Sequence, residues 1–198
     1  MTRDLLLALA LFAFVSSITP GPNNLMLMAS GANFGFRRSL PHMLGVALGF
    51  VFMLLLVGAG LIGLFQAWPA SHAVLKAVSV VYLLWLAWKI AHAAPGPGGQ
   101  AAGRPMSFLQ AAAFQWVNPK AWTMALTAIT AYAPDQDWRA ILLVGAVFGA
   151  INLPSVGSWT VLGQQMARLL TDPRRLRLFN RVMAGLLVAS LYPVVFAG

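Results

Sequence analysis

The stretch Thr19-Pro20-Gly21-Pro22-Asn23-Asn24 interrupts an apolar run that extends from Leu5 to Ser30. Each proline removes a backbone hydrogen-bond donor and disrupts a helix at that point. An apolar run of this length is typical of a membrane-spanning helix. Non-helical backbone at membrane depth is tolerated only against protein or a polar cavity. The interruption and its two asparagine amides therefore predict a broken transmembrane helix beside a polar site, with a simple proline kink as the alternative.

The composition of the whole chain favours lipid as the surrounding solvent. Of the 198 residues, 60% are hydrophobic and only 9% are charged, whereas soluble domains carry about 25% charged residues. The 13 lysines and arginines lie between long apolar runs and form no basic face, which argues against a nucleic-acid partner. The chain contains no cysteine, so disulfides and thiol chemistry are excluded.

Six apolar segments follow one another, each near the roughly 20 residues that a membrane-spanning helix needs. They cover residues 5–30, 43–65, 73–91, 108–131, 139–163 and 179–197. The fourth segment is interrupted, like the first, in this case at Asn118-Pro119-Lys120. We predict an all-α membrane protein with six transmembrane helices, of which the first and fourth are interrupted.

The two halves of the chain repeat the same features. Each has a first segment broken by proline, at Pro22 and at Pro119, and a second segment with a GxxxG pair, Gly45–Gly49 and Gly145–Gly149. The glycine pairs alone also fit close helix packing. Three helices per half is an odd number, so the second half must enter the membrane in the opposite sense. We therefore predict two inverted three-helix repeats, the architecture of secondary transporters.

A single transmembrane domain over residues 1–198 is expected, with repeat one at 1–92 and repeat two at 107–198. The linker over residues 93–106 contains Pro95-Gly96-Pro97-Gly98-Gly99, a composition typical of a loop. If the N-terminus lies outside, most lysines and arginines fall on inner loops, as the positive-inside rule requires. We expect a multi-pass protein of the bacterial inner membrane with both termini in the periplasm.

The two interruptions supply a candidate substrate site. In an inverted repeat, the half-helices that begin after them have N-termini that converge near the midplane, where free N–H groups and positive dipole ends favour an anion. Lys120 adds an ammonium at a depth where an unpaired charge is costly; a neutral amine held by carbonyls is the alternative. Amide and carbonyl oxygens could accept from a substrate ammonium, so the site suits an amino acid.

A third polar stretch, Asn152-Leu153-Pro154, lies in the fifth segment and either lines the same cavity or kinks the helix. The predicted substrate-binding residues are Pro20, Gly21, Pro22, Asn23, Asn24, Gln115, Asn118, Pro119, Lys120, Asn152 and Pro154. Catalytic triads, paired carboxylates, phosphate loops and HExxH are absent from the sequence, so we predict no enzyme, metal or cofactor. Three histidines near segment ends are interpreted as interfacial anchors: His42, His72 and His92.

The motif Ser17-Ile18-Thr19-Pro20-Gly21-Pro22-Asn23-Asn24 resembles the signature of the LysE/RhtB family of amino-acid exporters. Three further stretches are similar to the family: Gly35-Phe36-Arg37-Arg38, Tyr82-Leu83-Leu84-Trp85-Leu86-Ala87-Trp88-Lys89 and Asn118-Pro119-Lys120. The resemblance covers essentially the whole chain. It implies six helices and export of amino acids or close derivatives, driven by the proton-motive force. Ala87-Trp88-Lys89-Ile90-Ala91 is most similar to members that export cysteine and O-acetylserine.

The sequence as a whole predicts an inner-membrane secondary transporter that exports amino acids or related small zwitterionic metabolites by proton antiport. No carboxylate lies within a membrane segment, which leaves Lys120 as a candidate proton carrier. The expected partners are an amino-acid-like substrate, protons and the lipid bilayer, and a homodimer stays open. A passive small-solute channel and a membrane scaffold without transport activity are the alternatives.

Overall fold

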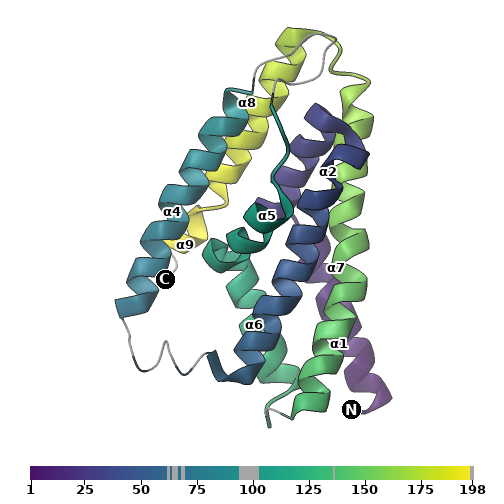
Figure 1. Ribbon diagram of the computed structural model, residues 1–198, viewed down its shortest axis with the longest axis vertical. Coiled ribbons are helices and arrows are strands. Elements are labelled where there is room, and N and C mark those ends of the chain that lie inside the picture. Colours follow the sequence, from purple (N-terminus) through teal and green to yellow (C-terminus); the bar gives the residue numbers. More distant parts are fainter. Residues whose placement is uncertain (62, 64–66, 68–69, 94–102, 136, 197–198) are drawn as a thin grey trace.

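Helices make up all the regular structure in the part of the chain that the computed structural model describes, residues 1–61, 63, 67, 70–93, 103–135 and 137–196 (Figure 1). In chain order they are α1 (Arg3–Ile18), α2 (Pro22–Leu56), the π-helix η1 (Val57–Leu61), α4 (Ala70–Ala91), α5 (Phe108–Phe114), the 3-10 helix η3 (Gln115–Val117), α6 (Pro119–Tyr132), α7 (Trp138–Ala167), α8 (Pro173–Ala189) and α9 (Tyr192–Phe196). The glycine- and proline-rich centre of the expected linker, Pro95–Gly99, lies outside the described residues.

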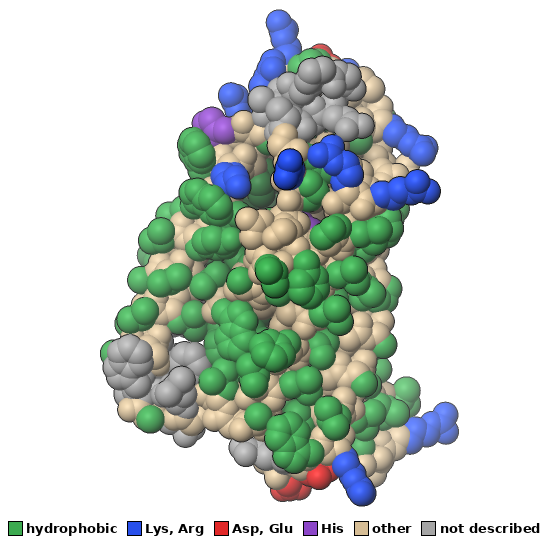
Figure 2. All heavy atoms as spheres, viewed as in Figure 1, with side chains coloured by type: hydrophobic (Ala, Val, Ile, Leu, Met, Phe, Trp, Pro, Cys, Tyr) green, Lys and Arg blue, Asp and Glu red, His purple; other side chains and the backbone are tan. Residues whose placement is uncertain are grey.

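The surface of the molecule is apolar over most of its height. Three stretches of the described chain are long and apolar enough to cross a membrane, namely Pro22–Leu61, Ala73–Ala91 and Trp138–Ala167. Figure 2 shows hydrophobic side chains over the middle of the visible face, while Lys and Arg gather mainly at one end. An apolar surface of this extent is suited to lipid. The prediction of a helical membrane protein is confirmed.

The chain reverses its direction inside α2. Gly35 has φ 77° and ψ 167°, a left-handed conformation that glycine adopts without a Cβ clash. Residues 22–34 and 36–56 then fold back on each other, since the hydroxyls of Ser30 and Ser39 lie 2.7 Å apart. The backbone N–H of Phe36 donates to the side-chain oxygen of Gln164 on α7 at 2.6 Å. The helix therefore consists of two arms, which we call the first arm (22–34) and the second arm (36–56).

Glycines allow α2 and its neighbours to approach closely. A Cβ at Gly31 would collide with the backbone carbonyl of Thr160 on α7, and one at Gly163 would collide with the carbonyl of Met28. The predicted pair Gly45–Gly49 similarly lies against the backbone of α5. Contacts of this kind are typical of membrane helices, in which small residues let backbones meet.

Helices α4 and α8 lie side by side and form a second group next to the bundle of α1, α2 and α7 (Figure 1). Their shared buried cluster also includes residues of α2 and α5; its members are Met26, Leu83, Leu86, Ala87, Phe114, Ala184, Leu187 and Leu191.

Basic residues of α2, of α4 and of the segment before α5 mark one end of the molecule, which we call the basic end. It is defined by Arg37, Arg38, Lys89 and Arg104, and Arg38 donates to the carbonyl of Gly103 at 3.1 Å.

Both predicted interruptions are present. Helix α1 ends at Ile18 and α2 begins at Pro22, and Thr19 between them is extended (φ −63°, ψ 144°). Asn118 is likewise extended (φ −98°, ψ 106°) between η3 and α6. Each new helix starts with a proline, at a position where the missing N–H would be unpaired anyway. In contrast, α7 continues through Pro154 without a break.

Candidate functional site

The two interruptions meet at the side chain of Lys120, in the first turn of α6. Its Nζ donates to the carbonyl oxygen of Thr19 at 2.7 Å, to Thr19 Oγ1 at 2.9 Å and to the carbonyl oxygen of Pro20 at 3.4 Å. These acceptors lie at the C-terminal end of α1, where unpaired carbonyls and the negative dipole end favour a cation. Lys120 therefore caps α1 from the other half of the chain.

Gly21 leaves room for this lysine. A Cβ placed on Gly21 would lie 2.7 Å from Cδ and 3.2 Å from Nζ of Lys120. The backbone of Gly21 is ordinary extended chain (φ −174°), so the requirement for glycine is one of space and not of conformation. Any larger side chain would push the lysine stem away from Thr19.

The other carbonyls at the end of α1 are also occupied by side chains. The amide of Asn24 donates to the carbonyls of Ser17 and Thr19, both at 2.8 Å. The indole N–H of Trp159 on α7 donates to the carbonyl of Ile18 at 2.9 Å. Because unpaired backbone is costly away from water, these donors make the break tolerable inside the bundle.

A reciprocal amide pair joins the two interruptions a second time. Asn23 Nδ2 donates to Gln115 Oε1 at 2.8 Å, and Gln115 Nε2 donates back to Asn23 Oδ1 at 3.2 Å. On the side of the second interruption, the Asn118 side chain accepts the Lys120 backbone N–H at 3.2 Å and caps α6. Residues predicted from two distant motifs thus form one polar centre.

A small cavity of about 20 Å³ lies at this centre, with room for about one water molecule. Its lining residues are Ser16, Ser17, Gly21, Asn23, Asn24, Phe50, Asn118, Lys120, Ala121, Met124, Asn152 and Val156. Among these residues Lys120 carries the one charged side chain. The volume is too small for an amino acid, although Thr19 and Pro20 beside it are exposed.

Asn152 contributes an acceptor that nothing in the described structure occupies. Its Nδ2 donates to Ser17 Oγ at 3.1 Å, whereas its Oδ1 is buried and has no hydrogen-bond partner among the described residues. A buried polar atom left unpaired costs about 1–3 kcal/mol. Since Asn152 lines the small cavity, this oxygen can accept a hydrogen bond from a donor that enters it.

Comparison with known proteins adds the family. A family model described as LysE type translocator matches residues 14–192 of the chain. The chain belongs to the LysE family. Three relatives are the cysteine/O-acetylserine efflux proteins of Escherichia coli (strain K12), Shigella sonnei (strain Ss046) and Shigella flexneri. Each is 32% identical over 190 residues, which is 95% of this chain and 96% of the relative.

No solved structure matches the chain. The predicted resemblance to the LysE/RhtB family, and to its cysteine/O-acetylserine members, is confirmed by the relatives. As a LysE-family translocator, the protein is a transport protein and not an enzyme.

The predicted substrate-binding residues of this LysE-family protein fall into three groups by their position relative to the small cavity. Six line the small cavity: Gly21, Asn23, Asn24, Asn118, Lys120 and Asn152. Four others lie next to it. Gln115 and Pro20 are hydrogen-bonded to lining residues, and Pro22 and Pro119 are the chain neighbours of lining residues at the starts of α2 and α6. Pro154 is exposed on α7 and is not among the lining residues.

Sequence reasoning missed the hydroxyl and indole groups of the site. Ser17 accepts a hydrogen bond from Asn152, and Thr19 accepts one from Lys120. The indole of Trp159 donates to a carbonyl of α1. The available signal was their position: two hydroxyl residues at the end of an apolar segment, immediately before a proline break.

Proposed function

We propose that this protein is a secondary exporter of amino acids or closely related small zwitterions, which bind between the two interruptions. The observation that carries the proposal is the position of Lys120, a cation whose ammonium is held by Thr19 and Pro20 at a point where both broken helices meet. An ammonium held by neutral oxygens can exchange them for a carboxylate, since the ion pair adds the attraction between two opposite charges to the hydrogen bond.

A bound zwitterion would satisfy the site in a complementary way. Its carboxylate would pair with Lys120 and with the free N–H groups at the start of α2, around Asn23 and Asn24. Its ammonium would replace Lys120 at the carbonyls of Thr19 and Pro20 and reach the unoccupied Oδ1 of Asn152. Because the cavity of about 20 Å³ is too small for an amino acid, binding requires the helices to separate, as alternating access demands.

We further propose that the protein crosses the membrane six times, as two inverted three-helix repeats. The crossings would be α1 with the first arm of α2, the second arm, α4, α5 with α6, α7, and α8 with α9. The reversal at Gly35 supports this count, because it turns the 40-residue stretch Pro22–Leu61 into two arms. The gathering of lysines and arginines at the basic end supports placing that end in the cytoplasm of a bacterium and both termini outside.

The substrate class follows from the relatives, whose names state efflux of cysteine and O-acetylserine. Both compounds are short zwitterions, which fits a site with one cation and several carbonyl acceptors. Energy would come from proton exchange across the inner membrane. A passive channel would give the same flux without a pH gradient, and a scaffold would give none.

The test is a substrate screen in proteoliposomes that contain the purified full chain. Efflux of labelled O-acetyl-L-serine is measured with and without an imposed pH gradient, in competition with a panel of unlabelled amino acids. We expect competition by short zwitterionic amino acids and faster efflux with the gradient. Gradient-independent flux favours the channel, and flux no faster than in protein-free liposomes contradicts the proposal.

A further inference from the structure

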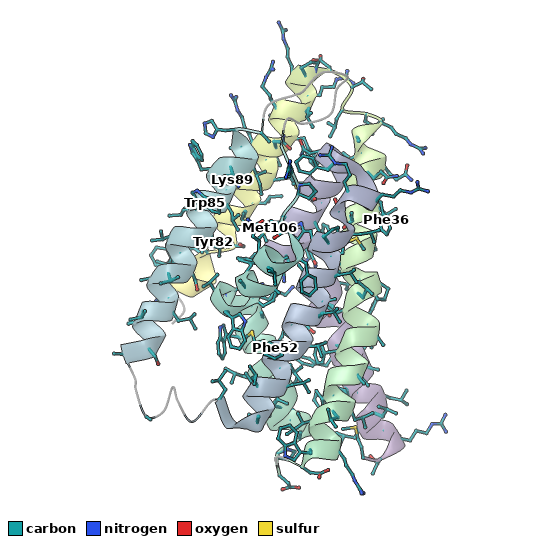
Figure 3. The ribbon with its side chains drawn as sticks, in the orientation of Figure 1. Phe36, Phe52, Tyr82, Trp85, Lys89 and Met106 are labelled. Carbon is teal, nitrogen blue, oxygen red and sulfur yellow. The ribbon has the colours of Figure 1, made fainter. Side chains whose placement is uncertain are left out.

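A second and larger cavity, of about 460 Å³, opens between α2, α4 and residues 103–106 at the basic end. Figure 3 shows Lys89 and Trp85 on α4, with Met106 on the segment that leads to α5. Pockets of 300–1,000 Å³ are the usual size for small-molecule ligands. Unlike the small cavity between the interruptions, this larger cavity has room for a small solute in the present conformation.

His42 is the unusual residue in the wall of this larger cavity. Its side chain is 2% exposed, and neither ring nitrogen has a hydrogen-bond partner among the described residues. The expectation that His42 anchors the protein at the membrane interface is therefore wrong, because the reversal at Gly35 turns it toward the interior. Buried polar groups are normally hydrogen-bonded, so an imidazole without a partner in a cavity wall is a candidate ligand-binding group. Both ring nitrogens are closed off from the cavity in this conformation, so a solute reaches them only when the His42 side chain or the wall around it shifts.

The neighbouring polar side chains of the wall are already paired. Ser30 and Ser39 share a hydrogen bond of 2.7 Å, and Ser39 also donates to the carbonyl of Gly35. Asn33 exchanges reciprocal hydrogen bonds with Asn180 of α8, at 2.8 and 3.2 Å. Among the buried polar side chains of this wall, His42 is therefore the one whose hydrogen-bonding groups are unpaired.

The charges around the cavity have one sign. Lys89 and Arg104 are the charged side chains in the lining, and no acidic residue is among the lining residues. The Lys89 ammonium lies 4.6 Å from the centre of the Trp85 ring, which holds it at the rim. A cleft lined by positive charge concentrates anions. The rest of the wall is apolar, with Met26, Phe34, Leu86, Ile90 and Met106.

The two cavities share a helix. Met26, Ala29, Ser30 and Asn33 line the larger cavity, and all four follow the site residue Asn23 on the first arm of α2. At 1.5 Å per residue, Ser30 lies about 10 Å along the helix from Asn23. A solute in the larger cavity is therefore about one to three helical turns from the centre where the interruptions meet.

We infer that the larger cavity is a substrate-binding site on the cytoplasmic side, which holds the carboxylate of the solute at His42 before it moves to Lys120. The ligand class is a small carboxylate with a short apolar or weakly polar side chain. This inference rests on the proposed export function, since an exporter must collect its substrate from the cytoplasm.

The chain contains no cysteine, so binding can be read by thiol labelling without removal of native thiols. Met106→Cys places a thiol in the cavity wall, and Arg168→Cys places one on the exposed end of α7, outside it. In inside-out vesicles, an anionic methanethiosulfonate reagent should modify both variants. O-acetyl-L-serine should slow the modification of Met106→Cys and leave that of Arg168→Cys unchanged.

Two comparisons test the chemistry of the site. The methyl ester of O-acetyl-L-serine, which lacks the carboxylate, should give no protection. Adding His42→Leu to Met106→Cys should raise the half-protecting concentration about tenfold, the effect of one lost hydrogen bond to a charged group. His42→Gln, which keeps a donor, should restore most of the affinity.

Equal protection by the ester overturns the inference, as does an unchanged half-protecting concentration in folded His42→Leu. The ester comparison needs no substitution at His42, so the test survives if that variant does not fold. Labelling reads binding and needs no transport. Protection without gradient-driven efflux therefore contradicts the exporter proposal alone, whereas efflux without protection contradicts this site alone.

Discussion

Gly21 and Lys120 depend on each other, because the lysine side chain passes over the glycine on its way to Thr19. A methyl group added at position 21 would lie 2.7 Å from Lys120 Cδ, which is closer than carbon atoms tolerate. Position 21 therefore controls whether the lysine can reach the carbonyls of α1. The pair links a residue of the first interruption to a residue of the second, so it tests whether their contact matters.

Gly21→Ala should lower efflux of O-acetyl-L-serine at least about tenfold, the effect of losing hydrogen bonds to a charged group. The variant should remain folded, because the lysine stem is flexible and can move aside. Gly185→Ala is the matched control, since a Cβ there meets nothing within 4 Å, and it should export normally. Full activity of Gly21→Ala would show that the contact between Lys120 and Thr19 plays no part in transport.

Asn152 should affect substrate affinity more than turnover. If its unpaired Oδ1 accepts a hydrogen bond from the substrate ammonium, Asn152→Ala raises the KM of efflux about tenfold. Ser158→Ala on the same helix removes an exposed hydroxyl that bonds only to its own helix, at the carbonyl of Ser155, and should leave KM unchanged. Equal KM values in Asn152→Ala and the unsubstituted chain would remove Asn152 from the site.

The residues of the site that the sequence predicted are those that are costly in a membrane. Asn23, Asn24 and Lys120 need partners at membrane depth, so their presence there points to a polar centre. Ser17 and Thr19 gave no such signal, because hydroxyls can bond to their own helix. His42 was misjudged because burial depends on the fold-back of α2, and linear position alone could not reveal the face that it occupies.

At the scale of elements, the helix interruptions could be predicted from the sequence, whereas the close contact between α2 and α7 could not. Proline marks the ends of α1 and of η3, and its effect on a helix is local. The approach of Gly31 to Thr160 and of Gly163 to Met28 depends on which helices become neighbours. Neither glycine belongs to the two repeated pairs Gly45–Gly49 and Gly145–Gly149, although Gly31 forms a further GxxxG pair with Gly35. Only the assembled bundle shows that Gly31 and Gly163 are the glycines at which α2 and α7 meet.

Gly163→Ala should destabilise the protein by about 1–3 kcal/mol, as expected for overpacking a close contact. The added methyl group would collide with the carbonyl of Met28 and force α2 and α7 apart. We expect a lower midpoint of thermal unfolding in detergent. Gly185→Ala should not lower it, since that position has open space. An unchanged midpoint in Gly163→Ala would mean that α2 and α7 can separate at this contact without loss of stability.

At the scale of the whole molecule, composition indicates a membrane protein and the folded chain adds how its helices group. The separation of α4 and α8 from the bundle of α1, α2 and α7 (Figure 1) leaves the larger cavity between the groups. Sequence periodicity could not predict this cavity, because apolar residues line most of the surfaces that enclose it. Its position is a property of helix arrangement and of the basic residues that meet at one end.

The proposed topology predicts where reporters are active. Alkaline phosphatase fused after Gly198 should be active, because the C-terminus would lie in the periplasm, and a green fluorescent protein at the same point should be dark. A fluorescent protein inserted after Arg104, at the basic end, should be bright, since basic loops stay in the cytoplasm. A bright fluorescent fusion at the C-terminus would contradict six crossings with both termini outside.

The most direct test of the central claim is gradient-driven efflux by Lys120→Met in proteoliposomes. Methionine keeps the length and flexibility of the side chain and removes the ammonium that joins the two interruptions. The account predicts that efflux of O-acetyl-L-serine falls at least about tenfold, as for the loss of charge-assisted hydrogen bonds, in a variant that remains monodisperse. Efflux at the rate of the unsubstituted protein would contradict it.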